Sequence, residues 1–84
     1  MTMEQQMQFI RQTIIRELKA ARGYLVPESA LIAAVLISAP AETHMFVRDQ
    51  LAWLEAERMA VAIRPQLGGE LRWKLTDMGS AAEV

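Results

Sequence analysis

Residues 51–76 read LAWLEAERMAVAIRPQLGGELRWKLT and contain the change of pattern that decides the fold. Up to Arg58 the apolar residues recur every three or four positions, which is the period of a helix, and beyond it they alternate with period two, which is the period of a strand. The two glycines at residues 68–69 supply a reversal of the chain at positive φ. The stretch therefore predicts the end of a helix followed by a β-hairpin over residues 59–76.

The hairpin is expected to have one face toward the core and one toward solvent. In its first strand the larger residues Met59, Val61 and Ile63 alternate with two alanines and an arginine, so we expect these three to face inward. In its second strand Trp73 belongs to the apolar set that alternates with charged residues, and we expect it in the core. The opposite face would be basic and would carry Arg64, Arg72 and Lys74.

Three helices are expected before the hairpin. Residues 1–22 contain neither proline nor glycine and place apolar side chains on one helical stripe, which Gly23 ends. Residues 28–38 are apolar on nearly all sides, so we expect them to form the most buried helix. After the break at Pro40, residues 42–57 again repeat apolar residues at helical spacing. The last two of these helices, joined by a tight turn, have the helix-turn-helix arrangement.

Residues 24–26 are strand formers but are too few for more than a short pairing segment. The predicted order is therefore helix, short strand, helix, helix, strand, loop, strand, which is a mainly α fold with a small antiparallel β-hairpin (α+β). At 84 residues the chain has room for one domain. We expect that domain to span residues 1–84, with residues 77–84 as a tail.

The composition excludes several classes of site. The chain has no cysteine and one histidine, so disulfides, thiolate zinc sites and multi-histidine metal sites are excluded. The glycines at residues 68–69 lie in a hairpin turn, without the following helix and lysine that a phosphate-binding loop requires. No motif for a catalytic nucleophile is recognisable. We therefore expect no metal, no cofactor and no enzymatic activity.

The N-terminal sequence MTMEQQMQFIRQ has neither the basic start nor the uninterrupted apolar run of a targeting segment. Residues 29–41 form the longest nearly uncharged stretch, and they are shorter than the roughly 20 residues that a membrane-spanning helix needs. We expect a cytoplasmic protein that makes no contact with membranes.

Two stretches resemble a known superfamily. Residues 51–65, LAWLEAERMAVAIRP, resemble the segment of MarR-like and related winged-helix proteins in which a recognition helix ends in LE, a turn follows and a hydrophobic strand closes on an arginine. Residues 72–84, RWKLTDMGSAAEV, resemble their second wing strand, which runs into an LTxxG signature. Together with the order of elements, nearly the whole chain resembles a winged helix-turn-helix domain of the kind found in small bacterial and prophage proteins.

Two features depart from the family pattern. Where the family usually has glycine between the recognition helix and the strand, this chain has Arg58. Either the turn avoids positive φ, or Arg58 adopts it at a cost of about 1 kcal/mol or more. MarR-like proteins also carry further helices that dimerise, whereas here only residues 79–84 follow the wing. A homodimer of the family type would therefore form through the first helix or not form at all.

The resemblance implies that the third helix enters the major groove of double-stranded DNA by its N-terminal half and that the wing contacts the DNA backbone. The residues so placed would be Thr43, His44 and Arg48 in the helix, with Arg64, Arg72 and Lys74 in the wing. Arg48 is suited to a bidentate contact with guanine. We thus expect a DNA-binding transcriptional regulator or accessory factor.

The charge pattern leaves a second interpretation open. The formal net charge is −1, and residues 42–58 hold four acidic and two basic residues. Because phosphate contacts supply most of the non-specific affinity for DNA, such a helix would bind weakly, and Arg48 would be a solvated charge. The alternative is a protein-interaction module whose partner meets the acidic helix and the apolar residues Phe9, Phe46 and Trp53. The last two can also pack against the second helix or the sheet, and the charges of the first helix are expected on its solvated face.

Overall fold

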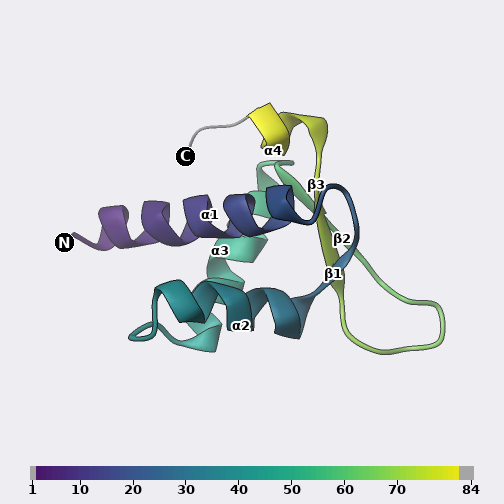
Figure 1. Ribbon diagram of the computed structural model, residues 1–84, viewed down its shortest axis with the longest axis horizontal. Helices are drawn as coiled ribbons and strands as arrows, with labels where there is room; N and C mark the ends of the chain where they lie inside the picture. Colours follow the sequence, from purple (N-terminus) through teal and green to yellow (C-terminus); the bar gives the residue numbers. More distant parts are fainter. Residues whose placement is uncertain (1, 82–84) are drawn as a thin grey trace.

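The computed structural model describes residues 2–81, which form four helices and three strands (Figure 1). The helices are α1 (Met3–Ala20), α2 (Glu28–Ser38), α3 (His44–Ala56) and α4 (Asp77–Ala81). The strands are β1 (Val26–Pro27), β2 (Ala60–Ile63) and β3 (Arg72–Leu75). The prediction of a mainly helical α+β protein with a small antiparallel sheet is confirmed.

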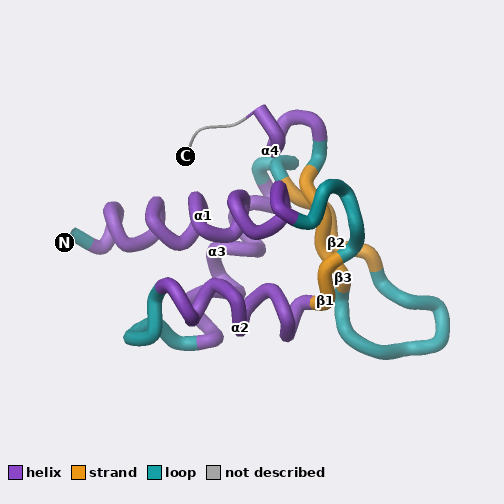
Figure 2. The backbone as a smooth tube through the Cα atoms, in the orientation of Figure 1, coloured by secondary structure: helices purple, strands orange, loops and turns teal. Residues whose placement is uncertain are grey.

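Helices α1 and α2 run side by side across Figure 1, with α3 behind them and the sheet at the end where α1 finishes and α2 begins. The sheet has the order β1–β3–β2, and both pairings are antiparallel. The short segment predicted at residues 24–26 is found as the two-residue strand β1, which begins two positions later and adds a third strand to the hairpin. The loop that joins β2 to β3 extends away from the helices (Figure 2).

Helix α1 begins and ends within the predicted range. Thr2 and Gln5 form a capping box, in which each side-chain oxygen accepts a hydrogen bond from the other residue's backbone N–H, at 2.9 and 3.1 Å. After Ala20 the chain reverses through Arg22 and Gly23, whose φ angles are 53° and 86°. Gly23 therefore acts in the reversal that ends the helix, as predicted.

The core lies where α1, α2 and α3 meet the inner face of the sheet. It contains twelve buried apolar residues: Ile10, Ile14, Ile15, Leu18, Leu31, Ile32, Val35, Val47, Leu51, Leu54, Ala60 and Trp73. Helix α2 contributes one face only, and its Ile37 is 82% exposed. The prediction that α2 would be the most buried helix is wrong, because α1 and α3 cover one side of it and nothing among residues 2–81 covers the other.

The inner face of the hairpin differs from the prediction. Ala62 lies opposite Trp73 in the β2–β3 pairing, so both side chains are on the core side, and Ala60 is buried two positions earlier. Val61 and Ile63 therefore lie on the outer face. The indole of Trp73 is buried on the core side, and the register that places Ala62 opposite it turns the neighbouring β2 residues to the other face. The expectation that Val61 and Ile63 face inward is wrong for this reason.

Arg58 adopts the left-handed conformation, with φ of 61°. Its N–H donates to Glu55 at 3.0 Å, and the N–H of Met59 donates to Leu54 at 2.9 Å. These two bonds form the Schellman motif that ends α3. Of the two alternatives for this turn, the one in which Arg58 adopts positive φ is confirmed.

The stretch after β3 folds back onto this turn. The hydroxyl of Thr76 donates to the carbonyl of Arg58 at 2.6 Å and accepts from the N–H of Gly79 at 3.0 Å. Gly79 is buried, and a Cβ placed on it would overlap the carbonyl group of Met59. The predicted tail thus begins with the helix α4, held to the end of α3 by Thr76, and residues 82–84 lie outside the described part of the chain.

Candidate nucleic-acid interface

Three of the six residues predicted to contact DNA lie at the start of α3 and on its exposed face. Thr43 lies just before the helix as its N-cap, and its hydroxyl accepts from the N–H of Phe46 at 3.1 Å. His44 and Arg48 are exposed one turn apart. Because Val47 and its core neighbours fix the buried face of the helix, these two side chains lie on its solvent-exposed side. The Thr43 hydroxyl, however, is already engaged as a cap.

Arg48 is held by a residue that the sequence pattern did not identify. Its Nε lies 3.4 Å from Oε2 of Glu28 in an ion pair in which the Arg48 side chain is 62% exposed and that of Glu28 is 14% exposed. The other carboxylate oxygen of Glu28 accepts a hydrogen bond from Nε1 of Trp73 at 3.2 Å. Glu28 therefore links the exposed face of α3 to the central strand of the sheet.

The outer face of the sheet brings two of the three predicted wing cations together. Lys74 lies opposite Val61, and Arg72 lies opposite Ile63, so all four side chains share that face. Arg64 follows β2 directly and is exposed. Among residues 2–81, these three cations have no hydrogen-bond or ion-pair partner.

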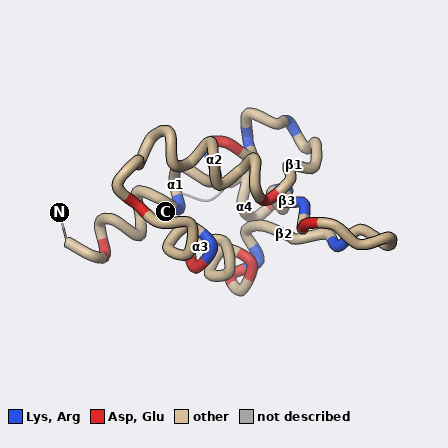
Figure 3. Tube along the Cα trace, turned by 90° about the horizontal axis from the view of Figure 1, so that it is seen from below, with Lys and Arg blue, Asp and Glu red and all other residues tan. Residues whose placement is uncertain are grey.

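The acidic residue of the same hairpin, Glu70, makes its contacts with the start of α2. The Glu70 carboxylate accepts from the backbone N–H and the hydroxyl of Ser29, at 3.2 and 2.9 Å. Helix α2 has no side-chain cap of its own, so Glu70 supplies one from the hairpin loop, at the end of the helix that favours negative charge. Figure 3 shows basic and acidic positions next to each other on α3 and on the hairpin. Along these two elements the charged positions are therefore mixed in sign.

The three residues considered for a partner interface have different surroundings in the structure. Trp53 is covered by the chain itself, because the guanidinium carbon of Arg11 lies 3.7 Å from the ring centroid. Phe46 packs against the core, and Phe9 on α1 is 40% exposed. The expectation that Arg11 belongs to a solvated face is wrong, since it also donates to the buried Gln50 at 2.8 Å.

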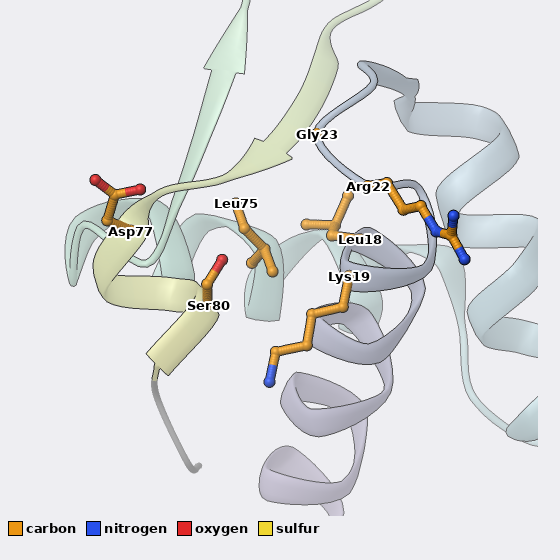
Figure 4. Close-up of a pocket in the computed structure, with 7 residues that line it drawn as sticks. All are labelled: Leu18, Lys19, Arg22, Gly23, Leu75, Asp77 and Ser80. Carbon is orange, nitrogen blue, oxygen red and sulfur yellow. The ribbon is translucent and has the colours of Figure 1, made fainter.

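A pocket of about 330 Å³ lies between the end of α1 and α4. Its lining residues are Leu18, Lys19, Arg22, Gly23, Leu75, Asp77 and Ser80 (Figure 4). The charged ends of Lys19, Arg22 and Asp77 point in different directions and do not converge on one position. The pocket therefore lacks the convergent polar groups of a ligand site.

Within residues 2–81, no three histidine, cysteine or acidic side chains come close enough together to hold a metal ion. In the same part of the chain, no helix combines the length and the apolar character needed to cross a membrane. Comparison with protein-family models, curated proteins and solved structures finds no match to this chain.

Proposed function

We propose that the protein is a winged helix-turn-helix DNA-binding protein that reads duplex DNA with α3 and contacts the DNA backbone with the β2–β3 hairpin. The order of elements supports this arrangement, since α2 and α3 are joined by the short turn at residues 39–43 and are followed by the hairpin. In this arrangement α3 is the recognition helix and the hairpin is the wing.

One observation carries the proposal. Glu28 contacts both Arg48 on α3 and Trp73 on β3, so the exposed face of the helix and the strand that bears Arg72 and Lys74 are fastened at one place. A helix and a hairpin joined in this way can meet the groove and the adjacent phosphates together. The free cations of the hairpin supply the phosphate contacts, and Arg48 supplies a contact to a base edge.

Affinity for DNA is expected to need two copies. One protomer offers three free cations for phosphate, Arg64, Arg72 and Lys74, which is few for a surface that must release counterions to bind. In a dimer, two recognition helices about 34 Å apart would double this number. Phe9 on α1 is 40% exposed and is the residue we assign to the dimer contact.

Fluorescence anisotropy with a labelled random-sequence duplex at low salt tests the proposal. The Lys74→Glu variant is expected to lose most of the binding, because it reverses a free cation on the outer face of the sheet. The matched control is Lys19→Glu, which makes the same charge change at an exposed position on α1, beside the pocket. The proposal would be rejected if both variants lost the same amount of DNA affinity. It would also be rejected if the unchanged protein did not bind the duplex at high micromolar concentration.

A protein-interaction module is the second candidate, and a specific observation supports it. Ile37 and Met45 are 82% and 68% exposed on the two sides of the α2–α3 turn, where they form no part of the core. A partner protein that bound there would be released by Ile37→Asp and would be indifferent to Lys74→Glu. The two variants therefore separate the two functions.

A further inference from the structure

Glu28 is fixed in place at both its backbone and its side chain. Its N–H donates to the carbonyl of Leu71 at 2.9 Å, directly after the pairing of β1 with β3. Its Oε1 accepts from Nε1 of Trp73, a core residue that is only 3% exposed. With its side chain 14% exposed, the carboxylate is an anchored group and not a mobile surface charge.

The second carboxylate oxygen of Glu28 contacts Arg48 at the inner end of its guanidinium group. The contact of 3.4 Å is made by Nε, the guanidinium nitrogen nearest the helix. The terminal nitrogens Nη1 and Nη2 lie two bonds farther out on a side chain that is 62% exposed. An unrestrained arginine would sample many rotamers, and this ion pair narrows that sampling before any ligand binds.

The pairing also decides what Arg48 can recognise. A guanidinium that is already neutralised by a carboxylate gains little from a phosphate, whose negative charge the carboxylate repels. Guanine is uncharged and presents O6 and N7 as two adjacent acceptors in the major groove, which match two N–H groups of one arginine. An oriented and charge-balanced arginine is therefore better suited to guanine than to the DNA backbone.

We propose that Glu28 is a positioning residue that orients Arg48 to read a guanine in the major groove. This inference rests on the DNA-binding function proposed above and adds the base that α3 recognises. It gives two expectations for Glu28→Gln. Guanine preference is lost, because Arg48 is no longer oriented, while non-specific affinity is retained or increases, because a negative charge near DNA is removed. The glutamine Oε1 can still accept from Trp73, so the core contact is kept.

The experiment is selection from a randomised duplex library by the full-length chain. The variants are Glu28→Gln, Arg48→Ala and the control Glu55→Gln, which removes an exposed carboxylate on α3 that has no ion-pair partner among the described residues. The unchanged protein and the control are expected to prefer guanine about tenfold at one position of the selected site, the lower part of the range for a bidentate contact. Glu28→Gln and Arg48→Ala are expected to lose that preference at the same position.

A second measurement needs no variant and no DNA. The NMR order parameter of the Arg48 Nε–Hε vector is expected to exceed that of Arg72, an exposed arginine without a partner in the described part of the chain. Equal order parameters would overturn the inference, as would retained guanine preference in Glu28→Gln. Binding by the unchanged protein without guanine preference overturns the inference but leaves DNA binding intact. If the unchanged protein enriches no sequence and binds no duplex, both proposals are rejected.

Discussion

Arg11 stacks on Trp53, with its guanidinium carbon 3.7 Å from the ring centroid, and the same guanidinium donates through Nε to Gln50 at 2.8 Å. The contact joins α1 to α3, and it satisfies Gln50, which is only 4% exposed. An arginine that the sequence pattern places among solvated charges thus stabilises the packing of the recognition helix that we propose.

The first prediction is that Arg11→Ala destabilises the protein by about 2 kcal/mol. The substitution removes a cation–π contact and leaves a buried amide oxygen without a donor, and each loss costs on the order of 1 kcal/mol. For a domain of this size the midpoint of thermal unfolding should fall by about 10 °C. Arg16→Ala is the control, because Arg16 makes one exposed hydrogen bond of 3.4 Å to Ser38. Equal shifts in the two variants would show that the contact with Trp53 contributes nothing.

The second prediction concerns the backbone at Arg58. Because Arg58 has φ of 61°, Arg58→Gly relieves the left-handed conformation and should raise the free energy of unfolding by about 0.5 to 1 kcal/mol after the entropy cost of glycine. Arg58→Ala keeps the conformational cost and should change stability little. Urea unfolding of both variants separates the backbone from the side chain. A stabilisation by alanine equal to that by glycine would assign the effect to the charge of Arg58.

The third prediction is that Gly79→Ala is more damaging than Gly68→Ala. The Cβ at position 79 would overlap the carbonyl of Met59, while at position 68 it meets nothing within 4 Å and the cost comes from the φ of 85° alone. We expect a loss of about 2 to 3 kcal/mol for Gly79→Ala and about 1 kcal/mol for Gly68→Ala. Thermal unfolding measures both. A similar loss of stability in the two variants would mean that α4 moves aside without cost.

The helices and the core position of Trp73 could be predicted from the sequence because they depend on local periodicity. Period two shows that a strand has two faces, but it does not say which face is inward. On β2 the register with the neighbouring strand places Ala62 opposite the buried Trp73, so Ala62 and not Val61 faces the core. Residue size alone was the wrong guide there.

The contacts that organise the candidate site could not be predicted because they join residues far apart in sequence. Glu28 and Arg48 are on different helices, and Ser29 and Glu70 come from a helix and a hairpin loop. Nothing in the local pattern distinguishes these carboxylates from the exposed acids of α3. Their roles follow from the folding of the hairpin against the start of α2, which is a tertiary arrangement.

The last prediction uses salt to count the phosphate contacts. If Arg64, Arg72 and Lys74 contact phosphate and Arg48 contacts a base, the plot of log affinity against log salt concentration should have a slope of about −3 per protomer, at about 0.9 per phosphate. Lys74→Glu should reduce the magnitude of the slope by about 1 or more, because it removes one contact and adds a repelling charge, while Glu28→Gln should not reduce it. Anisotropy titrations at several salt concentrations give these slopes.

A slope near zero would show that phosphate is not bound. A slope near −6 at high protein concentration would show that two protomers bind together, which is the outcome that a dimer through α1 requires.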